Sequence, residues 1–155
     1  MARTIATDTY VDRAGMVEFV RPRHHGILTT ARRDGRTQQS PVTMGLDDSD
    51  RVVVATYPER AKVMNARRDN QVAVLVLSDD FGGEWIQLYG TAEVLDIPEA
   101  VEPLVEYFRN IAGEHSDWAE YREAMVKQGK ALIRIAIEDW GPISRGGFPA
   151  RFAEE

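Results

Sequence analysis

The chain has 155 residues, of which 43% are hydrophobic and 28% are charged, with a net charge of −6 and no cysteine. This length suits one domain with a single core, and the missing cysteines exclude disulfides, thiolate nucleophiles and thiolate metal sites. The acidic balance argues against a nucleic-acid binder, and no apolar stretch reaches the roughly 18 residues of a membrane span. The first residues, "MARTIATDTYVDRAG", lack the apolar region of a secretory signal, so we expect a cytoplasmic protein.

The first half of the chain predicts one helix followed by three strands. In the helix, over 11–20, apolar residues recur every three positions as Val11, Ala14, Val17 and Val20. The strands are expected at 26–32, 37–46 and 51–56.

Three features mark the turns and edges of these strands. Asp34-Gly35 predicts a type I′ hairpin turn, because both central residues of that turn need a positive φ. Pro41 cannot donate to a ladder, so it indicates a bulge or a strand edge that faces a ligand. The acidic run "DDSD" at 47–50 is expected to close the second hairpin.

The second half predicts three more helices and three more strands. The helices are expected at 58–68, 98–112 and 116–128, and the strands at 71–79, 84–96 and 130–140. Six strands joined largely by hairpins indicate a mainly β (α+β) domain over 1–155, a small antiparallel barrel or strongly curled sheet with peripheral helices. The tail at 144–155 is expected to be mobile or to contact a partner.

The segment "TYPERAK" carries the first functional signal. Thr56 and Glu59 have the spacing of a capping box, so a helix should begin here. Arg60 and Lys62 would then lie at the positive end of the helix dipole, where unpaired backbone N–H groups favour an anion such as a phosphate. Asn65 should face the same side. The alternative is that both cations are solvated and offset by Glu59.

Several longer segments resemble a known family. The order of the Asp-Gly hairpin, "QQSPVTMGLD", "YPERAKVMNARRDNQVAVLV", a tryptophan-bearing strand and "YFRNIAGEHSDWAEYREAMV" resembles the pyridoxamine-phosphate-oxidase-like split-barrel flavoproteins. Within that family the chain is most similar to the subgroup of oxidoreductases that bind the deazaflavin coenzyme F420. The resemblance runs from about His25 to Ile137.

This resemblance implies a six-stranded split barrel of the FMN-binding type that forms a homodimer, with two cofactor sites along the interface. It implies that Arg60 and Lys62 bind the cofactor phosphate, that one strand lies along the deazaflavin ring, and that an aromatic residue stands nearby. The remaining implied cofactor-binding residues are Thr56, Ala61 and Asn65 around the phosphate, Gln39, Ser40, Pro41 and Val42 along the ring, and Trp85. No side chain is expected to be catalytic, because the cofactor carries the hydride.

Three functions remain open at this point. The first is an F420-dependent reductase that transfers a hydride to an activated C=C bond, a quinone or a similar small acceptor. The second is an FMN-dependent oxidoreductase of the same fold, and the third is a non-catalytic protein that binds a flavin or tetrapyrrole. Arg32, Arg33 and Arg36 could hold the polyglutamate tail of F420, although a solvated turn explains these arginines equally well.

The sequence disfavours pyridoxamine phosphate oxidase activity and a metal site. The C-terminal arginine-and-histidine pattern that pyridoxamine phosphate oxidases use for their substrate is missing, since only Arg145 and Arg151 are present. His24, His25 and His115 lack metal-ligand spacing, so no metal site is expected.

Overall fold

The computed structural model describes residues 3–154, so Met1, Ala2 and Glu155 of the predicted domain lie outside the described residues. Its helices are α1 (Arg13–Val20), α2 (Ala61–Arg68), α3 (Val101–Ala112), α4 (Trp118–Gln128) and the short 3-10 helix η1 (Ala150–Phe152). Its strands are β1 (Thr7–Thr9), β2 (His25–Ala31), β3 (Thr37–Thr43), β4 (Gly45–Leu46), β5 (Val52–Thr56), β6 (Gln71–Leu77), β7 (Trp85–Leu95), β8 (Ala131–Trp140) and β9 (Ile143–Arg145).

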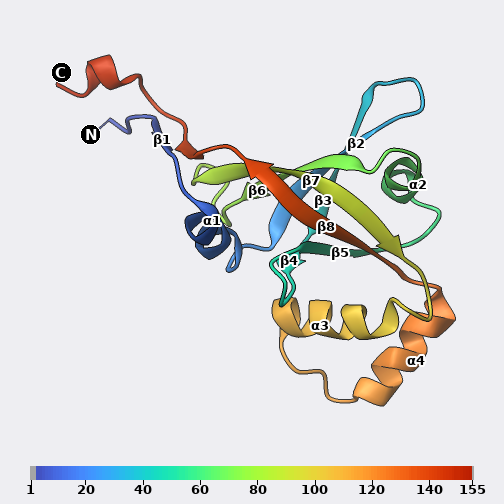
Figure 1. The fold of residues 1–155 in the computed structure, drawn as a ribbon. Coiled ribbons are helices and arrows are strands. Elements are labelled where there is room, and N and C mark those ends of the chain that lie inside the picture. The colour runs from blue at the N-terminus through green and yellow to red at the C-terminus, as the bar shows by residue number, and fades with distance from the viewer. Residues whose placement is uncertain (1–2, 155) are drawn as a thin grey trace.

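The strands form one curled antiparallel sheet in the order β3-β2-β6-β7-β8-β5-β4 (Figure 1). The two ends of this order, β3 and β4, are consecutive in the chain and are separated only by the buried Met44. A chain that passes directly from one end of a sheet to the other requires the sheet to curl into a half-barrel. The mainly β (α+β) split-barrel fold predicted from the sequence is therefore confirmed.

The predicted strand 37–46 is two strands. β3 pairs with β2, whereas β4 pairs with β5, so the hydrogen-bonding partner changes at Met44. Periodicity could not reveal this division because it reports which side chains are buried, not which strand lies alongside. With this division and the short strands β1 and β9, the described residues contain nine strands in place of the six expected.

Two hydrophobic clusters lie on the two faces of β8. Ile133 and Ile135 belong to the cluster inside the half-barrel, which α1 closes with Met16, Phe19 and Val20. Leu132 belongs to a second cluster, built with residues of α3 and α4. Successive strand residues face opposite sides, so β8 is covered on both faces at its start. The helices α3 and α4 lie together below the sheet in Figure 1.

The first predicted helix and the first predicted turn both need correction. In α1, Asp12 caps the helix by accepting from Gly15 N at 2.9 Å, and Ala14 is exposed while Met16 is buried. In the β2–β3 turn only Gly35 has a positive φ, of 86°, so the turn is not type I′. Gly35 N donates to Arg32 O at 2.9 Å, which places a left-handed glycine after an ordinary turn.

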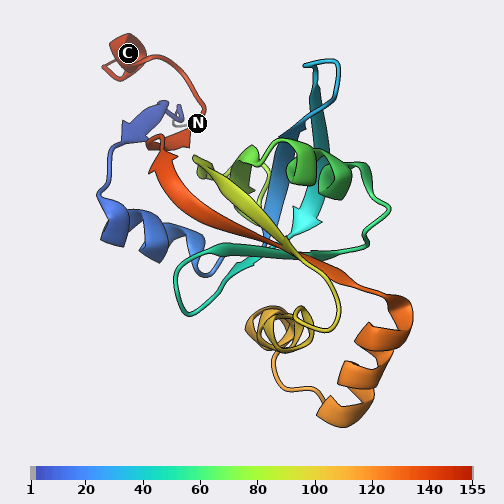
Figure 2. The same cartoon turned by 45° about the vertical axis from the view of Figure 1, so that its right-hand side comes forward.

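The predicted tail pairs with the start of the chain. β9 runs antiparallel to β1, with Asp8 opposite Ser144, and Ala6 N donates to Phe148 O at 2.8 Å. Figure 2 shows the two terminal segments together beside the end of the sheet. Whether this pair of segments contacts a partner stays a prediction.

Candidate functional site

The chain between β5 and α2 forms a turn before the helix begins. Arg60 N donates to Tyr57 O at 3.1 Å, so Pro58 occupies the second position of this turn, where its fixed φ is favourable. The helix itself begins at Ala61, with Arg60 as an N-cap that has no side-chain cap. The predicted start at residue 58 and the predicted Thr56–Glu59 capping box are therefore wrong, because Thr56 belongs to β5 and Pro58 serves the turn.

The start of α2 has the features of an anion site. The backbone N–H groups of Ala61 and Lys62 have no hydrogen-bond acceptor among residues 3–154, as expected for a first helical turn. Ala61 is exposed, and Lys62 is only partly buried. Two open amides at the positive end of a helix dipole attract an anion.

The two cations, Arg60 and Lys62, lie beside this site and repel one another. Partial burial lowers the pKa of Lys62, and the charge of Arg60 lowers it further. Glu59 forms no ion pair with either residue in the described part of the chain, so the alternative in which it offsets their charge receives no support from the structure. The cations at the other end of α2 are engaged: Arg67 pairs with Asp96 at 2.6 Å and Arg68 donates to Ala31 O at 2.6 Å.

A third cation, which sequence reasoning missed, lies at the same turn. The ammonium of Lys130 is 4.3 Å from the centre of the Tyr57 ring, and the guanidinium of Arg60 is 6.0 Å from that centre. The Tyr57 hydroxyl donates to Gln128 Oε1 at 3.3 Å. Thr56 pairs with Ala131, which brings the start of β8 to the start of α2. No local signal could have identified Lys130, because only the pairing of β5 with β8 places it there.

β3 forms the open edge of the sheet. Met44 N donates to His24 O at 2.8 Å and Arg32 N donates to Arg36 O at 2.7 Å, at the two ends of the β2–β3 pair. Hydrogen-bonded positions alternate along an antiparallel pair, so the backbone groups of Gln39 and Pro41 point away from β2. Pro41 thus removes no hydrogen bond from the ladder. The predicted edge is confirmed, and its role toward a ligand stays a prediction.

Ser40 and Val42 lie on the opposite side of β3 from Gln39 and Pro41, as strand alternation requires. Val42 is buried in the core at 9% exposure. The Ser40 hydroxyl is buried and has no hydrogen-bond partner in the structure. A buried polar group without a partner is costly, so this hydroxyl is suited to a ligand group that reaches the edge of β3.

Asn65 does not face the open amides. It is buried at 7% exposure, its Nδ2 donates to Thr30 Oγ1 at 3.1 Å, and its Oδ1 accepts from Arg68 Nη2 at 3.0 Å. Thr30 in turn donates to Gln38 Oε1 at 2.9 Å, and Gln38 Nε2 donates to Gln39 O at 3.2 Å. Asn65 therefore begins a chain of hydrogen bonds from α2 to the open edge of β3.

Trp85 is not close to the start of α2 within one chain. It opens β7, opposite Leu77 and Ser144, whereas α2 is linked to the other end of this strand, where Ala92 N donates to Asn70 O at 2.8 Å. The seven steps along the strand from Trp85 to Ala92 span about 23 Å of extended chain. Trp85 therefore lies at the opposite end of β7 from α2, and its predicted role near the cofactor stays a prediction.

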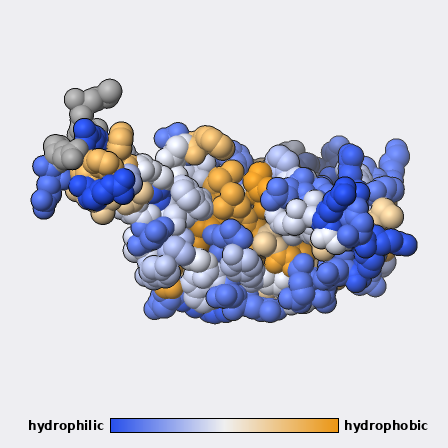
Figure 3. Space-filling view, turned by 90° about the horizontal axis from the view of Figure 1, so that it is seen from above, coloured by the Kyte–Doolittle hydropathy of each residue, from blue (hydrophilic) through white to orange (hydrophobic). Residues whose placement is uncertain are grey.

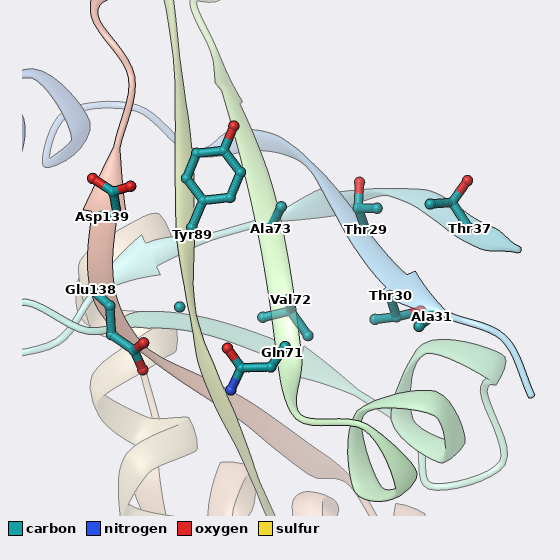
Figure 4. Close-up of a pocket in the computed structure, with 11 residues that line it drawn as sticks. Thr29, Thr30, Ala31, Thr37, Gln71, Val72, Ala73, Tyr89, Glu138 and Asp139 are labelled. Carbon is teal, nitrogen blue, oxygen red and sulfur yellow. The ribbon is translucent and has the colours of Figure 1, made fainter. Parts of the chain in front are cut away.

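A hollow of about 350 Å³ lies on the outer face of the sheet (Figure 4). It contains none of the predicted cofactor residues. Tyr89, Glu138 and Asp139 lie toward one side of it, and Thr29 and Thr37 lie toward the other. Sequence reasoning missed this surface, because its residues come from five strands (β2, β3, β6, β7 and β8) that only the pairing of the sheet brings together.

No group of three or more histidine, aspartate or glutamate side chains in residues 3–154 could hold a metal ion. Arg145 and Arg151 lie in the terminal segments, where Arg151 packs over the Phe152 ring at 4.7 Å. None of the described helices is long and apolar enough to cross a membrane.

Comparisons with known proteins agree with this fold. The family model described as pyridoxamine 5'-phosphate oxidase matches residues 13–144. The structure is similar to a conserved hypothetical protein from Mycobacterium tuberculosis, at 21% identity and a TM-score of 0.73 over 90% of this chain and 89% of that one.

Two further solved structures share the fold. One is an F420 reductase, at 19% identity and a TM-score of 0.58 over 78% of this chain and 90% of that one. The other is an FAD-binding protein from Mesorhizobium loti, at 13% identity and a TM-score of 0.62 over 92% of this chain and 100% of that one. At these identities the likeness describes the architecture.

Proposed function

The chain belongs to the pyridoxamine 5'-phosphate oxidase family, and from this premise we propose that it is an oxidoreductase that uses coenzyme F420. Reduced deazaflavin would transfer a hydride to an activated C=C bond, a quinone or a similar small acceptor. One structural neighbour, an F420 reductase, agrees with this choice of cofactor.

The observation that carries the proposal is the start of α2. The open N–H groups of Ala61 and Lys62 lie beside the cations Arg60 and Lys62, and the pKa of Lys62 is lowered by burial and by Arg60. A bound phosphate would accept hydrogen bonds from the amides and would remove the repulsion between the two cations. Because these cations repel one another, the protein is stabilised most when an anion binds beside them.

The edge of β3 fits the ring of the same cofactor. Gln39 and Pro41 point backbone groups away from the ladder, and Ser40 offers a buried hydroxyl that lacks a partner. These groups suit the polar edge of a flavin or deazaflavin ring. The hydrogen bonds that run from Asn65 through Thr30 to Gln38 fix the position of α2 relative to the edge of β3.

The chain's own contribution is to bind and orient. When bound, reduced deazaflavin supplies a hydride from its ring carbon and transfers single electrons to oxygen poorly, so an electron-poor acceptor is required. We assign no side chain as a proton donor. A flat ring against an open sheet edge can place acceptors of many shapes at about 3 to 3.5 Å, so we expect broad substrate tolerance.

We also propose that the protein works as a homodimer with a cofactor site at each side of the interface. The open edge of β3 supports a site that one chain leaves incomplete. Trp85 would then reach the cofactor of the partner.

Fluorescence titration of the purified protein with F420 and with FMN tests the cofactor. We expect tighter binding of F420, followed by oxidation of reduced F420 when menadione is added. Tighter binding of FMN would replace F420 by FMN in the proposal, and F420 binding without turnover on a panel of quinones and enones would favour a carrier. Binding of neither compound would overturn the proposal.

A further inference from the structure

The side chain of Tyr107 reaches from α3 to the sheet. α3 lies below the sheet in Figure 1, on the side away from the apolar surface that Figure 3 shows from above. The Tyr107 hydroxyl donates to Thr43 O, at the end of β3, at 2.9 Å. Burial raises the pKa of Tyr107, and a backbone hydrogen bond with Ala55 of β5 opposes this rise. Only a donor stabilises the phenolate, so the Ala55 N–H donates to the Tyr107 oxygen.

The backbone of Ala55 points toward the side of β5 on which β4 lies. In the β4–β5 pair, Asp47 N donates to Arg51 O at 2.9 Å, and Gly45 stands opposite Val53. Hydrogen-bonding positions alternate along a strand, so residues 51, 53 and 55 all direct their N–H and C=O groups toward this side. β4 begins at Gly45, so within residues 3–154 no strand pairs with Ala55 here.

Thr43 would be the next partner if this ladder continued. The register of the β4–β5 pair, continued by two residues, brings Thr43 opposite Ala55, so that Ala55 N would donate to Thr43 O. Thr43 O does point away from β2, because Met44 N donates to His24 O and hydrogen-bonding positions alternate. The Tyr107 hydroxyl takes the place of this ladder bond, since it accepts from one strand and donates to the other.

The two strands diverge beyond this point. The same register, continued further, would bring Pro41 opposite Tyr57, but Pro41 lies on the open edge of β3 and Tyr57 lies in the turn before α2. Pro41 has no N–H group, so it could not donate a ladder bond there. The edge proposed for the cofactor ring and the turn beside the proposed phosphate site therefore separate at the position that Tyr107 occupies.

We propose that Tyr107 is a positioning residue that keeps the end of β3 apart from β5, so that the cofactor ring can lie along Gln39 and Pro41. Without this side chain, Ala55 N can donate to Thr43 O directly and draw the end of β3 toward β5. A ligand must then reopen the edge before it binds, which lowers its apparent affinity. This inference rests on the ring site of the proposed function and adds the residue that holds that site open.

Two substitutions separate the role of the ring of Tyr107 from that of its hydroxyl. Tyr107→Ala removes the whole side chain, and F420 should then bind at least about tenfold more weakly, because a closed edge with one more ladder hydrogen bond competes with the ligand. Tyr107→Phe keeps a ring between the strands, so it should bind F420 more tightly than Tyr107→Ala does. Fluorescence titration measures both affinities, with FMN in place of F420 if FMN is the tighter ligand of the wild type.

Tyr121 supplies a matched control. Its hydroxyl donates to Leu104 O at 3.0 Å, so it is a second tyrosine of the α3–α4 pair that bonds a backbone carbonyl. Tyr121→Ala should lower the stability of the fold and leave the F420 affinity of the folded protein unchanged. Equal weakening of F420 binding by Tyr121→Ala and Tyr107→Ala would show that Tyr107 acts only through stability, and would overturn the proposal.

Hydrogen exchange of the Ala55 amide, followed by NMR, tests the bridge without any ligand. The amide should be protected in the wild type and should exchange faster in Tyr107→Phe, which lacks the accepting oxygen. It should be protected again in Tyr107→Ala, where Thr43 O becomes its acceptor. Equal exchange in the wild type and in Tyr107→Phe would overturn the bridge, even if Tyr107→Ala is too unstable to titrate.

Failure of this inference and failure of the proposed cofactor give different results. An unprotected Ala55 amide in Tyr107→Ala, together with wild-type affinity for F420, would overturn the role of Tyr107 and leave the cofactor in place. A wild type that binds neither F420 nor FMN would overturn the cofactor and the ring site, whereas the exchange of Ala55 would still show whether Tyr107 separates the strands.

Discussion

The Nδ2 atom of Asn65 donates to the Oγ1 atom of Thr30 at 3.1 Å, and both residues are buried. This bond joins α2 to β2, and Thr30 extends the connection to Gln38 on β3. The helix whose first turn offers open amides is thus fixed to the strand whose edge is open. The position of the candidate site depends on this buried polar connection.

Replacement of Asn65 by alanine should destabilise the fold. It leaves Thr30 and Arg68 each without one hydrogen-bond partner, which costs about 1 to 3 kcal/mol. Urea unfolding of Asn65→Ala measures this loss, with Met64→Ala as the control because Met64 is 57% exposed on the same helix. Equal stability of the two variants would show that the Asn65–Thr30 bond does not secure α2.

Removal of the two cations should weaken cofactor binding. Arg60→Ala combined with Lys62→Ala should reduce the affinity for F420 or FMN by about 2 to 4 kcal/mol, because charge-assisted hydrogen bonds to the phosphate are lost. Fluorescence titration measures the change. Arg67→Ala serves as the control, since it removes a cation from the other end of the helix that is already paired with Asp96. Unchanged affinity in the double variant would remove the phosphate from this site.

Lys62 should lower the stability of the ligand-free protein. Its pKa is lower in the folded state than its ordinary value, so the unfolded chain binds its proton more tightly. The resulting penalty applies at pH values below the folded pKa and is relieved as the pH rises through it. At neutral pH, Lys62→Gln should therefore stabilise the free protein by about 0.3 to 1 kcal/mol, the usual effect of a misplaced charge in a first helical turn.

Thermal unfolding with and without cofactor checks this expectation. Without cofactor, the Lys62→Gln variant should be more stable than the wild type. At a cofactor concentration that saturates the wild type, the variant should be the less stable protein, because it binds the cofactor less tightly. A variant that is less stable in both conditions would indicate that Lys62 supports the fold itself.

Tyr121 should make the protein sensitive to alkaline pH. Its hydroxyl donates to Leu104 O at 3.0 Å, and burial, with a smaller effect of Tyr107, raises its pKa from 10.0 to about 12. A raised pKa gives stability that is present below the unfolded pKa and lost as the pH rises through the folded one. The wild type should thus lose roughly 2 to 3 kcal/mol from this group between pH 10 and 12.

Tyr121→Phe should lose this part of the pH dependence. At pH 8 the variant should be about 1 to 2 kcal/mol less stable than the wild type, because Leu104 O loses a hydrogen bond. Denaturant unfolding at pH values from 8 to 12 should show the difference shrinking and then reversing as the pH rises. A constant difference over this range would contradict the assignment.

Local patterns predicted most of the secondary structure. The alternation in 130–140 predicted β8, and the apolar run of 71–79 predicted β6, because strand burial repeats every two residues. Pro41 predicted a bulge or a strand edge, since proline donates no hydrogen bond to a ladder, and the structure shows the edge. The start of α2 was misplaced, because Pro58 is equally compatible with a helix start and with the turn that it forms.

The candidate site was only partly predictable. Arg60 and Lys62 are near one another in the sequence, so a local argument about helix dipoles found them. Asn65 was expected to face the same anion, whereas packing directs it to Thr30. Lys130 reaches the site through the pairing of β5 with β8, a relation that no local pattern encodes.

By itself, the sequence determined the alternation of its strands, the position of the hairpins and the two adjacent cations, because each depends on residues within a few positions of one another. The tertiary structure decided where the chain crosses at Met44, that the Ser40 hydroxyl is buried without a partner, and that Glu138 and Asp139 lie across the sheet from the β2–β3 hairpin. These features depend on which distant strands pair and in which register, and hydrophobic periodicity leaves both undetermined.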